Sequence, residues 1–290
     1  PDTVFLIGSI VKDFTKMGIL LLQDEGKLSV SDPIGNFFAD VPGDKRNITI
    51  KQLLDHTSGI PDLIALDNSI IPEYFVDYDY IPVTRDQAIT KTMNAPLLFE
   101  PGGDEVYSNS GYALLAAIIE IVSGETYEGY LNRRIFSPAG MMQTGYVLPD
   151  WSHSLLARGI DEGKDWGVPL DGNRWMTDGP SWNLRGNGGM LGTAPDLALW
   201  VRALKADNIL PKAARNNFLE NRKQSKNWNS LILASAGSNG IFNAVYVWME
   251  DQKRNLVLIS SNSEYNAELT YLHPMLGLVF EMSASAKENK

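Results

Sequence analysis

Residues 1–12 read Pro1-Asp-Thr-Val-Phe-Leu-Ile-Gly-Ser9-Ile-Val-Lys12. An apolar, strand-like segment runs here into Ser9, which stands three places before Lys12. If a helix begins at or near Ser9, this spacing puts the lysine amine on the same helical face as the hydroxyl, close enough to take its proton. A serine hydroxyl is a weak nucleophile until a base lies beside it. The stretch therefore predicts a serine nucleophile with a lysine partner.

The same residues have a second interpretation, in which Ser9 caps a helix N-terminus and Lys12 is a solvated surface side chain. Two observations favour catalysis. The chain contains no other Ser-x-x-Lys, and the helix expected over residues 11–23 is too apolar for a protein surface. We therefore expect this helix in the core.

Composition narrows the class of protein. A chain of 290 residues with 44% hydrophobic residues can bury a large core. Its net charge of −10 and the absence of clustered Lys and Arg argue against nucleic acid or an anionic membrane as a partner. Cysteine is absent, which excludes disulfides, thiolate catalysis and Cys-ligated zinc. No apolar run approaches the roughly 20 residues that a membrane-spanning helix needs, and we expect no cofactor and no metal.

Periodicity and capping signals predict an α+β fold, because helices fill the middle of the chain and antiparallel strands follow. We expect an antiparallel sheet flanked by helices plus an all-helical lobe. Residues 1–290 would form a single domain, with the helical lobe at about 27–205 and the sheet lobe at 1–26 and about 230–285. Residues 60–83 are expected to be a long surface segment and 138–187 to be irregular. The expected helices are 11–23, 50–56, 85–95, 112–122, 127–136, 197–205 and 267–282, and the expected strands are 231–233, 242–249 and 256–261, with a hairpin turn at 251–254.

Two further motifs accompany Ser-x-x-Lys in enzymes that use it, a Tyr/Ser-x-Asn loop and a strand with Lys/His-x-Gly. Here they correspond to Tyr107-Ser-Asn109 and Ser235-Ala-Gly237. Tyr130-Leu-Asn132 also fits the loop pattern, but Tyr130 falls inside an expected helix, where packing is the better interpretation. Tyr107 follows a Pro-Gly-Gly turn and precedes an apolar helix, so its hydroxyl can point into a cleft.

With these motifs in place, the chain resembles the class C β-lactamase family, which includes serine D-alanyl-D-alanine peptidases, D-amino-acid amidases and family VIII esterases. The resemblance implies the β-lactamase/transpeptidase-like fold. It extends to about Asn262 and is carried by segments in the family's order, which are Phe5-Leu-Ile-Gly-Ser-Ile-Val-Lys-Asp-Phe-Thr15, Gln23-Asp-Glu-Gly-Lys-Leu-Ser29, Leu53-Leu-Asp-His-Thr-Ser-Gly-Ile-Pro61, Pro101-Gly, Tyr107-Ser-Asn-Ser-Gly-Tyr112 and Gly186-Asn-Gly-Gly-Met190.

The resemblance implies acyl transfer through a covalent acyl-enzyme. Ser9 would attack, Lys12 would hold or accept its proton, and Tyr107 would pass that proton to the leaving group; which of the two is the principal base stays open. Asn109 would bind the substrate and help to fix Lys12. The backbone N–H groups of Ser9 and Ser238 would form the oxyanion hole.

The third motif departs from the family pattern. Ser235 stands where the family has a lysine or histidine, so the cation that would bind a β-lactam or peptide carboxylate is missing. A neutral serine cannot supply that charge-assisted bond. We therefore expect poor β-lactamase activity and a substrate that is an ester or a neutral-ended amide, with D-amino-acid peptides also within the family's range. Ser235, Gly237 and Ser238 are the residues of this motif that we expect to contact the substrate.

The start of the chain is a second departure, because the family has a helix and two strands before the segment that matches Pro1. We expect either that the sequence is an excerpt or that a partner covers the face left exposed. Relatives are often exported, which favours a periplasmic or secreted protein. The alternative function is a catalytically weak or silent penicillin-binding-like protein with a binding role.

Three other features receive structural interpretations. His56, His153 and His273 are too scattered for a Ser-His-Asp triad, and His56 is expected to be structural at a helix end, where a cation suits the helix dipole. Residues 186–189 lack the strand-then-helix context of a dinucleotide loop, so we expect a tight turn near the cleft. The tryptophans either pack in the core or line a substrate pocket.

Overall fold

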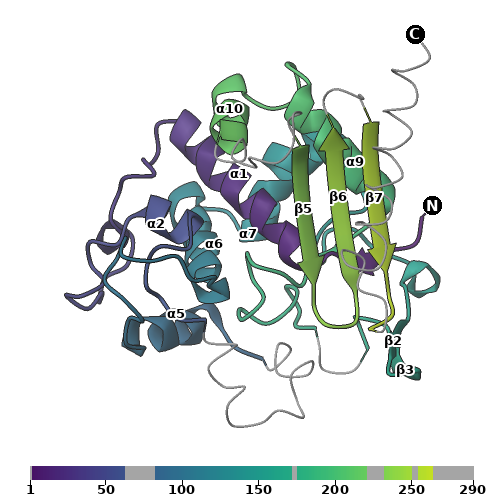
Figure 1. Cartoon of the computed structure of the whole chain (residues 1–290), viewed down its shortest axis with the longest axis horizontal. Coiled ribbons are helices and arrows are strands. Elements are labelled where there is room, and N and C mark those ends of the chain that lie inside the picture. The colour runs from purple at the N-terminus through teal and green to yellow at the C-terminus, as the bar shows by residue number, and fades with distance from the viewer. Residues whose placement is uncertain (1, 63–81, 172–174, 221–231, 250–253, 264–290) are drawn as a thin grey trace, which may run out of the picture.

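The computed structural model describes residues 2–62, 82–171, 175–220, 232–249 and 254–263 (Figure 1). The long surface segment expected at 60–83 and the helix expected at 267–282 fall mostly or wholly outside these residues, as does most of the hairpin turn at 251–254. The helices are α1 Val11–Asp24, α2 Ile50–Leu54, α5 Arg85–Asn94, α6 Asn109–Ser123, α7 Tyr127–Leu131, α8 Ser137–Ala139, α9 Ala194–Lys205 and α10 Lys212–Glu220. The strands are β1 Phe5–Leu6, β2 Gly159–Asp161, β3 Lys164–Gly167, β4 Leu191–Gly192, β5 Ile232–Ser238, β6 Asn243–Met249 and β7 Arg254–Ser260, and short helical turns occupy Gly8–Ile10, Ile34–Asn36, Asn132–Phe136 and His153–Leu155.

The mixed α+β class is confirmed. Strands β5, β6 and β7 form an antiparallel sheet in that order, and Ser235 pairs with Tyr246 across β5 and β6. Helix α9 packs against β6 and β7, whereas α1 packs against α6, α7 and α10 (Figure 1). The division into two lobes with the boundaries given above stays a prediction.

Helix α1 lies in the core as its composition predicted. Every residue from Val11 to Leu22 is buried, including Lys12 and Asp13. Gly18 faces α6 so closely that an added Cβ would lie 2.9 Å from the side chain of Ile119. A helix that is apolar nearly all round needs neighbours on every side, and α6, α7 and α10 supply them.

Local signals predicted most helix boundaries. Thr49 and Thr84 form complete capping boxes, each accepting from the backbone N–H three residues on. Helix α2 ends two residues earlier than expected, because His56 adopts a left-handed φ of 59°. Gly124 ends α6 in the left-handed conformation that glycine adopts readily after a helix.

Four elements were missed or shortened by sequence reasoning. Helix α10 lies in a stretch where no helix was expected, because few of its residues are apolar; Ala214 and Phe218 are buried, and Leu219 packs against the core. Strands β2 and β3 form a short hairpin in the region expected to be irregular. Strand β5 extends to Ser238, well beyond the expected 231–233, since pairing with β6 continues through small residues of low strand propensity.

Candidate active site

Ser9 lies in the short helical turn that leads into α1, directly after strand β1. Strand β1 pairs with β4 through Phe5 and Leu6, and the Ile7 N–H donates to the Met190 carbonyl at 3.0 Å. Neither this turn nor α1 has a side-chain cap, so the interpretation of Ser9 as a helix cap is wrong. Its hydroxyl lies 2.7 Å from the Tyr107 hydroxyl instead.

Lys12 is buried and fully engaged beside Ser9, so its interpretation as a solvated side chain is wrong. Its side chain is 6% exposed. The Nζ atom donates to Ser9 Oγ at 3.1 Å, to Asn109 Oδ1 at 2.7 Å and to the Asn187 carbonyl at 2.8 Å. It also lies 4.7 Å from the centre of the Tyr107 ring. These acceptors hold the amine within reach of the serine hydroxyl.

Tyr107 completes the group around Ser9 from the loop before α6. Burial raises the pKa of Tyr107 to about 12; the hydrogen bond with Ser9 opposes the rise, and the nearby carboxylates of Asp62 and Asp13 add to it. The phenol is therefore protonated at neutral pH and can donate a proton. Tyr130, which fits the same sequence pattern, is fully buried in the core cluster, in agreement with the packing interpretation.

His56 supports Tyr107 as a neutral side chain, which corrects the expectation of a cation at a helix end. The two rings lie 4.6 Å apart between centres, and His56 Nδ1 accepts the Ser108 N–H at 3.1 Å. Burial lowers the pKa of His56 to about 4, and the positive charge of Lys12 adds to the shift. The structural role is as expected, but it depends on the uncharged ring.

Asn109 is the first residue of α6, and its side-chain amide lies between two charged groups. Oδ1 accepts from Lys12, and Nδ2 donates to Asp62 Oδ2 at 2.8 Å. Sequence reasoning missed Asp62, although it directly follows the segment ending at Pro61 that carried part of the family resemblance. No spacing rule links residue 62 to residue 109.

Residues 186–189 form a turn beside Lys12, where a tight turn was expected. Gly186 has a φ of 79°, and a Cβ there would lie 2.6 Å from the Tyr112 carbonyl. Thr15 Oγ1 donates to the Gly186 carbonyl at 2.6 Å, and Asn187 Nδ2 donates to the Asn109 carbonyl at 3.3 Å. The turn thereby presents its Asn187 carbonyl to Lys12.

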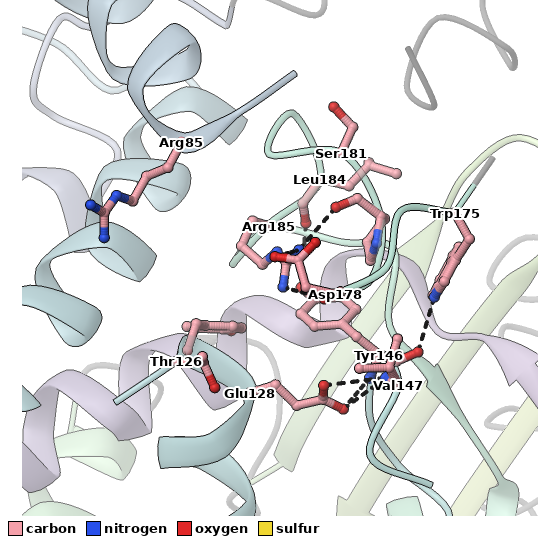
Figure 2. A network of polar contacts seen from close by, with 12 residues as sticks. Arg85, Thr126, Glu128, Tyr146, Val147, Trp175, Asp178, Ser181, Leu184 and Arg185 are labelled. Carbon is pink, nitrogen blue, oxygen red and sulfur yellow. Dashed lines mark hydrogen bonds and ion pairs between the residues drawn. The ribbon is translucent and has the colours of Figure 1, made fainter. Parts of the chain in front are cut away.

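A polar network around Glu128, Tyr146 and Arg185 contacts this turn, and Figure 2 shows the side chains of these three residues. The Tyr146 hydroxyl donates to the Gly188 carbonyl at 3.0 Å and accepts the Gly186 N–H at 3.2 Å. Glu128, which is 4% exposed, accepts backbone N–H groups from three consecutive residues, Tyr146, Val147 and Leu148. Arg185 stacks on the Tyr146 ring and donates to two carbonyls, those of Asp178 and Pro180.

Strand β5 packs against the short helical turn that holds Ser9. An added Cβ on Gly237 would lie 2.2 Å from the Ile7 carbonyl oxygen and 2.5 Å from the Ser9 nitrogen. One on Gly8 would lie 2.4 Å from the Ser238 nitrogen. Because alternate residues of a strand share a face, Ser235 points to the same side as Gly237. The structure thus brings Ser9, Gly237 and Ser238 together and places Ser235 two residues away from Gly237 on the same face of β5.

The described part of the chain has no group of three His, Asp or Glu side chains that could hold a metal ion. None of the helices in the described ranges is long and apolar enough to cross a bilayer. Of the tryptophans, Trp200 is fully buried and donates to the Tyr246 hydroxyl at 3.1 Å, so it packs in the core.

A family model described as Beta-lactamase matches residues 1–268 of this sequence. The chain belongs to the beta-lactamase family. Among curated relatives, Penicillin-binding protein 4* of Bacillus subtilis is 30% identical over 236 residues, which is 74% of this chain and 48% of the relative. Putative penicillin-binding protein PbpX of the same species is 38% identical over 146 residues, or 50% of this chain and 34% of the relative. This beta-lactamase family chain spans about half or less of the length of these two relatives.

Solved structures confirm the β-lactamase/transpeptidase-like fold. A penicillin-binding protein from Bacillus halodurans has a TM-score of 0.75 at 25% identity, covering 96% of this chain and 87% of that one. The octameric penicillin-binding protein homologue from Pyrococcus abyssi has a TM-score of 0.74 at 24% identity, covering 96% and 66%. A D-amino acid amidase from Ochrobactrum anthropi, complexed with L-phenylalanine, has a TM-score of 0.72 at 23% identity, covering 90% and 77%.

Proposed function

We propose that this chain is a serine hydrolase that cleaves esters or amides through a covalent acyl-enzyme. One observation carries the proposal. The Ser9 hydroxyl lies 2.7 Å from the Tyr107 hydroxyl and 3.1 Å from Lys12 Nζ, and Asn109 Oδ1 holds the same amine at 2.7 Å. A nucleophile within hydrogen-bond reach of two proton-transfer groups, one of them oriented by a third residue, is the arrangement that activated serines require.

In the proposed first step, Ser9 Oγ attacks the substrate carbonyl carbon and loses its proton to Lys12. The negative charge that develops on the carbonyl oxygen is stabilised by the backbone N–H groups of Ser9 and Ser238, each worth about 3 kcal/mol. The C–N or C–O bond then breaks, and the leaving group takes a proton through Tyr107. Water attacks the acyl-enzyme in the second step, giving up its proton as Ser9 regains one.

The acid–base properties of Tyr107 favour Lys12 over the phenol as the first proton acceptor, once the ammonium that donates the three hydrogen bonds has released a proton. Because the pKa of Tyr107 lies above its ordinary value of 10, the phenol is protonated at neutral pH. The phenol therefore serves as a proton donor and carrier, and its hydrogen bond with Ser9 puts it on the path from nucleophile to leaving group.

The residue at position 235 favours a substrate that has no carboxylate at the end that would contact strand β5. Ser235 offers a hydroxyl where family members have a cation, and neutral donors bind carboxylates less strongly than ammonium or imidazolium groups do. The amidase from Ochrobactrum anthropi was also solved with L-phenylalanine amide, a neutral-ended amide. We infer a preference for esters and neutral-ended amides, including amides of D-amino acids, over penicillins.

The test is covalent labelling with a fluorophosphonate, followed by mass spectrometry of the modified peptide. The wild-type chain should carry one adduct, on Ser9, and Ser9→Ala should carry none. Tyr107→Phe keeps the serine but removes the proton carrier, and should slow labelling by a factor of about 10² or more. Ser110→Ala, next to the site on α6, is the matched serine control and should be labelled like wild type. Labelling that persists in Ser9→Ala would refute the assignment.

A second candidate function is a binding protein that acylates without efficient turnover. The observation that favours it is Ser235, because a site lacking the family's cation positions carboxylated substrates poorly. Hydrolysis of p-nitrophenyl esters and D-phenylalanine amide separates the two candidates. Turnover of either substrate supports the hydrolase, whereas stoichiometric labelling without turnover supports the binding role.

A further inference from the structure

Asp62 reaches the Ser9 site from a segment that is held against the start of α6. The Ser108 hydroxyl donates to the Pro61 carbonyl at 3.4 Å, and the Leu98 N–H donates to the Gly59 carbonyl at 2.8 Å. These bonds fix the backbone just before Asp62. Its carboxylate Oδ2 then accepts from Asn109 Nδ2 at 2.8 Å.

The amide of Asn109 therefore has partners of opposite kind on its two sides. A lysine ammonium can only donate hydrogen bonds, and an ionised carboxylate can only accept them. Of the two orientations that differ by a flip of the amide, only one faces Oδ1 to Lys12 and Nδ2 to Asp62. The reverse orientation would set donor against donor and acceptor against acceptor, and would lose both bonds.

Without Asp62, nothing in the amide's own shape distinguishes its two ends. Its oxygen and nitrogen are nearly the same size, so their partners decide the orientation. Lys12 alone would still favour Oδ1, but the amide could rotate away from it. Because the amide contact is as short as 2.7 Å, a shift of Asn109 changes where Lys12 Nζ sits relative to Ser9 Oγ.

We propose that Asp62 is a positioning residue, which orients the Asn109 amide and through it holds Lys12 at the Ser9 hydroxyl. This inference rests on the proposed function and deepens it. The negative charge also acts on the site directly, since Asp62 contributes to the raised pKa of Tyr107. The orienting role leaves Nδ2 its second hydrogen, which can be offered to a substrate carbonyl.

A double-mutant cycle on fluorophosphonate labelling tests the proposal. Asp62→Ala should slow labelling of Ser9 by about tenfold, because Lys12 loses its fixed position. In an Asn109→Ala background the same change should slow labelling by less than about twofold, since the residue through which Asp62 acts is gone. Asp165→Ala removes the same charge from an exposed ion pair with Arg158 and should leave the rate unchanged.

Asp62→Asn separates orientation from charge. Its amide oxygen can still accept from Asn109 Nδ2, so labelling should stay within about threefold of wild type. Thermal midpoints of all variants establish that they are folded, and Asp62→Asn keeps the side-chain shape if Asp62→Ala does not fold.

The outcomes are distinct. Equal slowing by Asp62→Ala in both backgrounds would show that Asp62 acts independently of Asn109 and would overturn the proposal. Slowing by Asp62→Asn as large as that by Asp62→Ala would overturn the orienting role in favour of charge. A wild-type chain that is not labelled at all would instead overturn the proposed function, and is recognised before any variant is compared.

Discussion

Replacing Gly237 by alanine tests how closely strand β5 must approach the nucleophile. The backbone at Gly237 is outside the left-handed region, so alanine meets no conformational penalty there. The substitution is unfavourable because the added Cβ has no room. The new Cβ would lie 2.2 Å from the Ile7 oxygen, 2.5 Å from the Ser9 nitrogen and 2.8 Å from the Gly8 carbonyl carbon. All three are backbone atoms, which cannot rotate away as a side chain would.

The size of the expected effect of Gly237→Ala follows from the steric overlap of the new Cβ with these backbone atoms. Ordinary contact begins at about 3.4 Å, so β5 and the turn holding Ser9 must separate by roughly 1 Å. Such a displacement moves Ser238 and Ser9, the proposed oxyanion donors, relative to each other. We expect labelling of Ser9 to slow by about 10²-fold, which is the usual effect of a 1 Å misplacement. The free energy of unfolding should fall by about 1–3 kcal/mol, as for other overpacked sites.

The assay is the second-order rate of fluorophosphonate labelling, with urea unfolding measured on the same samples. Gly43→Ala is the control, because a Cβ on Gly43 would meet no atom within 4 Å and its φ is also outside the left-handed region. That variant should match wild type in both measurements. A Gly237→Ala protein that is labelled within threefold of the wild-type rate would show that the close approach is unimportant for the site.

Three further predictions concern the surroundings of the site. Glu128→Ala leaves three backbone N–H donors without their acceptor, so urea unfolding should show a loss of at least about 3 kcal/mol; Glu125→Ala, which breaks an exposed ion pair, should cost less than about 1 kcal/mol. Because the pKa of His56 falls from 6.5 to about 4 on folding, its neutral form stabilises the fold fully above pH 6.5, and this part is lost as pH falls from 6.5 to 4. The stability of wild type relative to His56→Asn should therefore drop by up to about 3 kcal/mol between pH 7 and pH 4, measured by urea unfolding at each pH. Ser235→Lys restores a cation to strand β5 and should speed labelling by a fluorescent penicillin by about tenfold or more, and an unchanged rate would contradict the reason given for the substrate preference.

Local sequence signals predicted the elements whose ends are set by hydrogen bonds between residues close together in the sequence. The capping boxes at Thr49 and Thr84 and the C-cap at Gly124 mark helix ends by hydrogen bonds within a few residues. Helix α10 and the far end of β5 escaped prediction for the opposite reason. They are held by long-range contacts with α1 and β6, which leave little local pattern.

The candidate site also combines residue pairs that local spacing predicted with contacts that only the fold makes. Ser9 and Lys12 are three residues apart on one turn, and Tyr107 and Asn109 belong to one short motif, so spacing and motif predicted each pair. Their meeting across 98 residues, at 2.7 Å between the two hydroxyls, is a property of the fold. Asp62 could not be predicted from spacing. A hydrogen bond to Asn109 places Asp62 in the site, and no periodicity in the sequence connects residue 62 with residue 109.

By itself, the sequence of this protein predicted a buried helix after Ser9 from residue types and their spacing. The expected role of Ser9 and Lys12 in acyl transfer, and the missing cation of the third motif, came from the resemblance to the family's motifs in the same sequence. Tertiary structure decided that Lys12 is buried among three oxygen acceptors, that His56 is neutral and that Gly237 must have no side chain. The physical reason is that burial, desolvation and close approach depend on segments far apart in the chain, so no local stretch can specify them.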